Sequence, residues 1–149
     1  MFEIVKSLLS TNEIKKLEET LIITVAEGYQ LFGEFLISKI DNRYRVTKYN
    51  TGLEAYFYNL QNATIFVILY KRNKVVELKR MLELDVLLES ANADLIRYKN
   101  RGTDLDSKII SFTKFEEARH RKYVVSKEIL EFSQDAKTWQ ETRYKEAIK

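Results

Sequence analysis

The residues of this sequence that could bind a metal ion gather around its one histidine. Glu116 and Glu117 come shortly before His120, so a helix would place the three side chains close together. A helical two-metal carboxylate site needs a second Glu-x-x-His pair and further inward carboxylates, and one histidine cannot supply them. We therefore expect a solvated charged face here, with no metal and no cofactor.

Sequence patterns of other catalytic sites are also missing from the chain. It has no cysteine, which excludes thiolate nucleophiles, thiolate metal sites and disulfides. Asp104 and Asp106 are better explained as a helix cap and a partner of the helix dipole than as paired catalytic acids. The four glycines form no phosphate-binding loop, and no nucleophile motif is present. We expect that the protein is not an enzyme and has no small-molecule substrate.

A cluster of basic residues offers a different chemistry, the binding of phosphates. The densest basic run covers 119–122, and a hairpin folded about Gly102 would bring it near a second basic pair. Such a cluster contacts nucleic acid without reading its sequence. Glutamates interleave with these residues, so a salt-bridged helical face is the alternative explanation. The candidate nucleic-acid patch comprises Lys79, Arg80, Arg119, Arg121 and Lys122.

Large apolar side chains near the end of the chain are candidates for a protein interface. Aromatic anchors supply much of the binding energy at such interfaces. Trp139 lies on the same apolar stripe as Phe132, so burial in the chain's own core is the alternative. The candidate partner interface comprises Phe132, Trp139 and Ile148.

Length and composition limit how these residues can be positioned. A chain of 149 residues with 45% hydrophobic and 32% charged side chains has a globular composition. Its length is typical of one domain, so we expect a single domain over 1–149. The net charge of +3 permits nucleic-acid binding without favouring it. The longest apolar run, 63–70, is too short to span a membrane.

The N-terminal segment, 1–27, is predicted to be helical. Ser10 and Glu13 have the spacing of a capping box, and apolar residues recur after them at helical intervals. A helix over about 11–26 follows, with Gly28 ending it. The first residues lack the apolar core and cleavage site of a signal peptide.

The next segment, 28–59, is predicted to form a small antiparallel sheet. Asp41-Asn42 and Asn50-Thr51-Gly52 are turn sequences, and the residues between them alternate between apolar and polar. These features predict a three-stranded meander over about 29–58. The first strand would bury Tyr29, Leu31, Gly33, Phe35 and Ile37 on one face.

Residues 60–149 are predicted to form a long antiparallel α-helical hairpin of coiled-coil type, which makes the fold class α+β. The stretch from Ala63 to Tyr70 could be helix or strand by its composition. If it is helical and runs on to Tyr98, the two arms match in length. Six apolar residues then follow at intervals of three and four, as in a coiled coil: Met81, Leu84, Leu88, Ala91, Leu95 and Tyr98.

The second arm is predicted to be one helix over about 104–147, roughly 65 Å long. Its apolar stripe is interrupted at Lys122, which indicates either a locally overwound supercoil or a change of packing partner there. The predicted stripe comprises Leu105, Ile109, Phe112, Phe115 and Ala118, then Val125, Ile129, Phe132, Ala136 and Trp139.

Several stretches of the chain resemble small uncharacterised proteins of marine tailed phages, of the cyanophage and pelagiphage type. The resemblance covers about 28–145 and rests on YQLFGEFLI at 29–37, the segment 56–85 with its Leu-x-Asn-Ala helix start, and DAKTWQ at 135–140. It implies that 60–71 is helical, which favours the matched hairpin. No known activity comes with this resemblance, and no functional residue is transferred from it.

These observations favour a non-enzymatic phage structural or protein-interaction protein, whose hairpin packs against itself or against other phage subunits. The alternative is an accessory nucleic-acid-binding protein of phage DNA metabolism that uses the mid-hairpin basic patch. We expect the protein in the virion or the host cytoplasm, without membrane contact.

Overall fold

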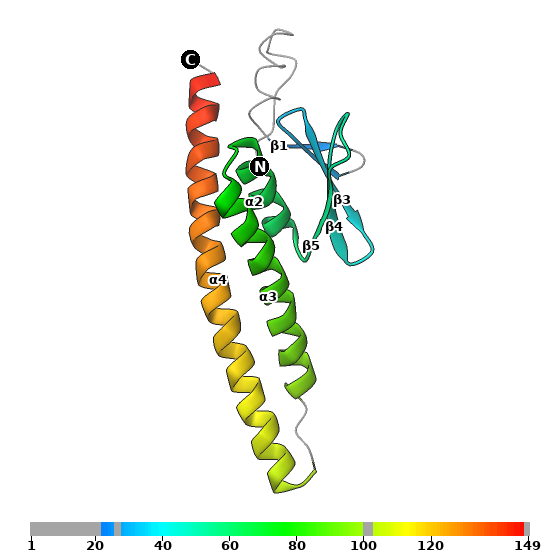
Figure 1. Ribbon diagram of the computed structural model, residues 1–149, viewed down its shortest axis with the longest axis vertical. Helices are drawn as coiled ribbons and strands as arrows, with labels where there is room; N and C mark the ends of the chain where they lie inside the picture. Colours follow the sequence, from blue (N-terminus) through cyan, green and yellow to red (C-terminus); the bar gives the residue numbers. More distant parts are fainter. Residues whose placement is uncertain (1–21, 26–27, 100–102, 148–149) are drawn as a thin grey trace.

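The computed structural model describes residues 22–25, 28–99 and 103–147, and it has an α+β fold (Figure 1). A small antiparallel sheet comes first and three helices follow it, the last two packed as a long hairpin. The predicted fold class is confirmed at this level. The elements are β1 (Ile22–Val25), β2 (Gly28–Leu31), β3 (Phe35–Ile40), β4 (Arg43–Lys48), β5 (Glu54–Phe57), α2 (Leu60–Lys71), α3 (Val75–Lys99) and α4 (Leu105–Ala147).

The sheet is an antiparallel meander in which each strand pairs with its neighbour in sequence. Strands β2 to β5 form four consecutive strands, and β1 adds a fifth at the edge. The predicted turn at Asp41-Asn42 is confirmed: it joins Ile40 to Arg43, and Asp41 has a φ of 55°. One face of the sheet is buried, through Leu31, Phe35, Ile37, Val46 and Phe57.

The predicted N-terminal helix over 11–26 lies mostly outside the described residues, and its last part is wrong. Residues 22–25 form β1, which pairs with β2. Their sequence, IITV, is rich in β-branched residues, whose restricted side chains favour strands over helices. Gly28 does not end a helix but begins β2, and a Cβ on it would lie 2.1 Å from the backbone oxygen of Ile37. This close approach of two strands explains the glycine.

The predicted first strand of the meander is two strands, because the chain turns at Phe32 and Gly33. Both residues have positive φ values, 58° and 71°, and Leu31 pairs with Phe35 across the connection. The amide of Glu34 donates to the carbonyl of Leu31 at 3.1 Å and closes the turn. Gly33 was therefore predicted wrongly as a buried strand residue; it is exposed at the turn.

The stretch from Ala63 to Tyr70 is helical and lies in α2, between the sheet and the long hairpin. Ala63, Phe66 and Val67 join the core of the sheet, whereas Ile65 and Leu69 join the core of α3 and α4. A helix that is apolar on nearly all sides belongs between two layers. This position explains why the composition of α2 did not distinguish helix from strand.

The two arms of the hairpin do not match in length, because the first arm breaks after α2. Asn73 adopts a left-handed φ of 58° and donates its amide to the carbonyl of Tyr70. The amide of Lys74 donates to the carbonyl of Leu69, which completes a Schellman motif. The chain reverses there, so that Asn62 near the start of α2 lies beside Asp85 in the middle of α3.

Helix α4 is confirmed as one long helix. Its buried and half-buried stripe, the inner seam, is continuous, so the predicted interruption is wrong. It faces α3 first and then α2 and the sheet core. Lys122 does not interrupt the stripe: it is half-buried in an inner position, where its aliphatic stem can pack. The inner seam comprises Ser111, Phe115, Ala118, Lys122, Val125, Ile129, Phe132, Ala136, Trp139 and Arg143.

The predicted inward positions of Leu105, Ile109 and Phe112 are wrong, since all three side chains are exposed. A spacing of alternating threes and fours, continued back from Val125, passes through Ser111 and Phe115 instead. Leu105, Ile109 and Phe112 therefore lie on a different side of α4 from the inner seam.

Candidate interaction surface

A second stripe follows an exposed flank of α4, roughly 100° around the helix from the inner seam, and is here called the outer seam. It keeps the coiled-coil alternation of fours and threes over 105–130. Its apolar members are largely exposed, from 51% for Leu130 to 72% for Leu105. The outer seam comprises Leu105, Ile109, Phe112, Glu116, Arg119, Tyr123, Ser126 and Leu130.

Charge interrupts the outer seam at its centre. Arg119 donates to the carboxylate of Glu116 at 2.8 Å, one helical turn away. Together with His120 and Tyr123, this pair lines a shallow hollow in the surface of α4. These four residues have the spacing i, i+3, i+4, i+7, which is the spacing of a hole that receives a knob from a facing helix. The surface thus has the shape and the period of one side of a helix pair.

The residues of the predicted nucleic-acid patch do not form one patch. Arg80 binds Glu128 across the hairpin at 2.6 Å, and Arg121 binds Asp94 at the same distance. At ~1.5 Å per residue, Arg80 and Asp94 lie about 21 Å apart along α3. The predicted proximity of the two basic groups is therefore wrong.

Ion pairing also reduces the charge that this patch could offer to phosphates. The hydrogen bond from Arg80 lowers the pKa of Glu128, and the one from Arg121 lowers the pKa of Asp94. Arg119 is paired with Glu116, as described above. Lys79 is exposed, whereas Lys122 is half-buried in the inner seam. The salt-bridged helical face weighed from the sequence is what the structure shows around the arginines.

The predicted partner-interface residues are not brought together on an open surface. Phe132 packs against the core between α3 and α4, and Trp139 packs against the core of the sheet. The indole of Trp139 meets Phe32 edge to face and lies under the guanidinium groups of Arg72 and Arg143. Ile148 lies outside the described residues.

A buried carboxylate, not anticipated from the sequence, joins three elements. Asp85 in α3 accepts hydrogen bonds from the backbone amide of Tyr58 at 3.0 Å and from the side-chain amide of Asn62 at 2.9 Å. Burial raises the pKa of Asp85, and these two donors oppose the rise. Since its Oδ1 accepts from both donors, this carboxylate holds α2, α3 and the end of β5 together.

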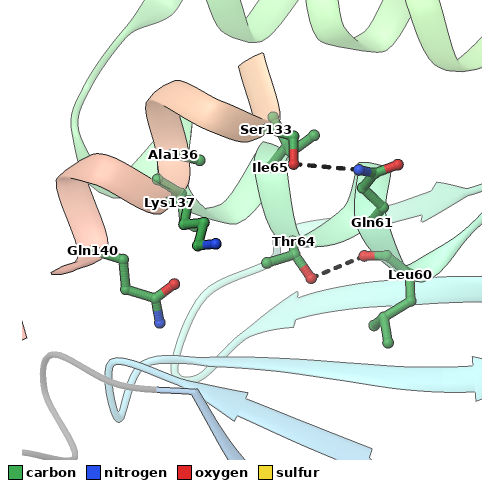
Figure 2. A pocket seen from close by; sticks show the side chains of 9 residues that line it. Leu60, Gln61, Thr64, Ile65, Ser133, Ala136, Lys137 and Gln140 are labelled. Atoms are coloured by element: carbon green, nitrogen blue, oxygen red, sulfur yellow. Dashed lines mark hydrogen bonds between the residues drawn. The ribbon is translucent and has the colours of Figure 1, made fainter. Parts of the chain in front are cut away.

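An open crevice of about 350 Å³ separates α2 from α4. Figure 2 shows Lys137 reaching from α4 toward Thr64 on α2, with Gln140 one turn further along. Several polar side chains that line the crevice already form hydrogen bonds within the chain: Gln61 donates to Ser133, and Thr64 donates to the carbonyl of Leu60. The crevice has mainly apolar walls, and no buried polar group converges on it as in a ligand site.

Within the ranges that the structure describes, no group of histidine, cysteine and acidic side chains is arranged to hold a metal ion. The same ranges contain no helix with the length and hydropathy needed to cross a membrane.

The sequence did contain a signal for the outer seam. The change of spacing before Lys122 arises because two stripes, one inner and one outer, overlap in the same stretch of α4. Tyr123 and Leu130 continue the spacing of Leu105, Ile109 and Phe112, so separating the two series would have assigned them to one side of the helix.

Comparisons with known protein families, with known proteins and with solved structures found no match to this chain.

Proposed function

We propose that this protein is a non-enzymatic phage structural or protein-interaction protein, whose long helical hairpin packs against itself or against partner subunits. The observation that carries the proposal is the outer seam of α4. Apolar stripes exposed over several helical turns mark interaction sites, because a soluble protein gains by covering them. The phage origin rests on the resemblance of 28–145 to proteins of marine tailed phages.

The rest of the molecule supports an interaction role by the way it holds α4. The helix is anchored along its inner seam against α3, α2 and the sheet core. It therefore presents the outer seam as a rigid surface, and a rigid surface loses little conformational entropy when it binds. Virion and host cytoplasm are both compatible with such a role.

The alternative function, an accessory nucleic-acid-binding protein, gains no support from the arrangement of the basic residues. Arg80, Arg119 and Arg121 each bind a carboxylate of the same chain. Phosphates would have to compete with those partners. Binding of this kind weakens steeply with salt, so it remains distinguishable by experiment.

The test of the proposed function is the solution mass of the untagged protein, from size-exclusion chromatography with light scattering at low and moderate salt. We expect an oligomer whose mass changes little with salt. The variant Leu105→Lys/Ile109→Lys should shift it toward the monomer, whereas Val124→Lys, an exposed change outside both seams, should not.

Two results would contradict the proposal. One is a monomer at both salt concentrations that binds DNA or RNA at low salt and releases it at moderate salt. The other is an oligomer that the seam variant leaves intact, since the outer seam would then not be the surface involved.

A further inference from the structure

We infer that the outer seam of α4 pairs with the outer seam of a second copy of this chain, in the antiparallel direction, about a twofold axis between residues 117 and 118. This inference rests on the proposed function and names its partner. A twofold pair is also the commonest form of homo-oligomer.

The spacing of the outer seam is the first argument for self-pairing. From Leu105 to Leu130 the intervals are 4, 3, 4, 3, 4, 3 and 4, which read the same from either end. Reversing one helix about the proposed axis therefore brings every seam position of one copy opposite a seam position of the other. Such layers are the unit of packing in a coiled coil.

The residue types match across the same axis. Leu105 lies opposite the partner's Leu130, and Phe112 lies opposite the partner's Tyr123. Both layers join side chains of similar size and character, and aromatic pairs gain beyond the area that they bury. Ile109 opposite the partner's Ser126 is the one layer without a match.

Charge fixes the direction of pairing. Antiparallel pairing places Glu116 opposite the partner's Arg119, so that two copies contribute four charges of alternating sign around the axis. Parallel pairing in register would place glutamate against glutamate and arginine against arginine, which is unfavourable. The apolar layers alone would allow either direction, and the central pair selects one.

The hollow at the centre of the seam supports the same register. Glu116, Arg119, His120 and Tyr123 surround it. In the proposed pair, the side chain that enters it is the partner's Glu116, which meets Arg119 and His120. The entering carboxylate thus meets one cationic wall, Arg119, beside the imidazole of His120, while Glu116 of the receiving copy is held by its own bond to Arg119. By symmetry the same contact occurs twice.

Cross-linking tests the direction. The chain has no cysteine, so introduced cysteines are the only reactive thiols. Positions 105 and 130 lie about 38 Å apart on one helix, too far to be linked within a copy. We expect Leu105→Cys/Leu130→Cys to give covalent dimers with a short thiol cross-linker, and Leu105→Cys alone to give almost none. Dimers from Leu105→Cys alone would overturn the antiparallel direction.

Charge reversal tests the register. Glu116→Arg or Arg119→Glu alone would place like charges across the axis and should weaken dimerisation roughly tenfold or more. The double variant Glu116→Arg/Arg119→Glu restores both pairings and should dimerise within about threefold of the native protein. Circular dichroism spectra establish that each variant is folded.

The outcomes separate this inference from the proposed function. If Leu105→Lys/Ile109→Lys disperses the native oligomer, but charge reversal has no effect and Leu105→Cys alone gives covalent dimers, the antiparallel pair is wrong and the interaction role stands. If the native protein is a monomer throughout, the pair is wrong. If that monomer also binds nucleic acid in a salt-dependent way, the proposed function is wrong as well.

Discussion

Phe32 and Trp139 meet edge to face, with ring centroids 5.7 Å apart and ring planes at 82°. Phe32 lies in the turn between β2 and β3 with a left-handed φ, an unusual conformation for a bulky residue. Trp139 also receives the guanidinium groups of Arg72 and Arg143, 5.6 Å and 4.9 Å from its ring. This cluster ties the sheet, the end of α2 and the C-terminal half of α4 together at one point.

We expect Trp139→Ala to destabilise the fold by about 3 kcal/mol, because it removes the aromatic partner of Phe32 and the apolar face below both guanidinium groups. Trp139→Phe should cost less than half as much. Urea unfolding followed by circular dichroism measures both. Val124→Ala, exposed on the same helix, should change the free energy of unfolding little. A cost for Trp139→Ala as small as that of the control would show that the cluster does not stabilise the monomer.

The buried carboxylate of Asp85 should be needed for stability rather than for any reaction. Asp85→Ala leaves the amide of Tyr58 and the side-chain amide of Asn62 without their acceptor, at a cost of roughly 2 to 4 kcal/mol. Asp85→Asn keeps one oxygen acceptor and should cost clearly less. Denaturant unfolding compares the two variants, and equal costs would mean that the hydrogen bonds to this oxygen are not what matters.

Three glycines give a graded test of the sheet. Gly28→Ala forces a Cβ against the backbone of Ile37 and should cost more than about 2 kcal/mol. Gly33→Ala meets no atom within 4 Å but keeps a left-handed φ, so about 1 kcal/mol is expected. Gly52→Ala has open space and no positive φ and should be close to neutral. Thermal unfolding ranks the three, and a cost for Gly28→Ala no larger than that for Gly33→Ala would contradict the close approach of β2 to β3.

Acid should destabilise the protein through carboxylates that are paired in the folded state. Hydrogen bonds from Arg121, Ser107 and Arg80 lower the folded pKa values of Asp94, Asp104 and Glu128, respectively. A lowered folded pKa gives stability that is complete above the unfolded value of about 4 and is lost as the pH falls through the folded value.

Asp85 acts in the opposite direction, because its raised folded pKa makes its protonation favour the folded state. Because three carboxylates lose stabilisation on acidification and only one gains it, the free energy of unfolding should still fall at low pH. We therefore expect the melting temperature to be nearly constant from pH 7 to about 5 and to fall below about pH 4. A variant combining Asp94→Asn and Glu128→Gln should show a shallower fall. A native melting temperature that rises on acidification would contradict this balance.

Secondary structure and burial were predicted correctly from the sequence where a local pattern was compatible with only one structure. The spacing of Met81, Leu84, Leu88 and Ala91 has a single helical face, and all four are buried. The turn at Asp41-Asn42 was predictable because asparagine and aspartate tolerate left-handed backbone. Strand β1 was missed because helix-capping residues precede a β-branched run, and pairing with β2 decided the outcome.

The end of α2 and the outer seam were harder to predict for related reasons. Asn73 carries the left-handed turn that glycine usually provides, so the reversal after α2 resembled a continuous helix. In α4, two stripes share one stretch of sequence, and their spacing alone does not say which of the two faces α3. The placement of Trp139 in the chain's own core likewise depends on contacts with the distant Phe32 and Arg72.

Because each strand pairs with its neighbour in the chain, the fold also indicates the order in which contacts can form during synthesis on the ribosome. Each strand pairs with the one made just before it, and α3 then folds back on α2, so most contacts close short loops and should form quickly. Trp139, however, leaves the ribosome long after Phe32. Until it arrives, the apolar side chains of α2 that α4 covers are open to solvent. We therefore expect docking of α4 to be the last folding step and a chain stalled before Trp139 to be the form most liable to aggregate.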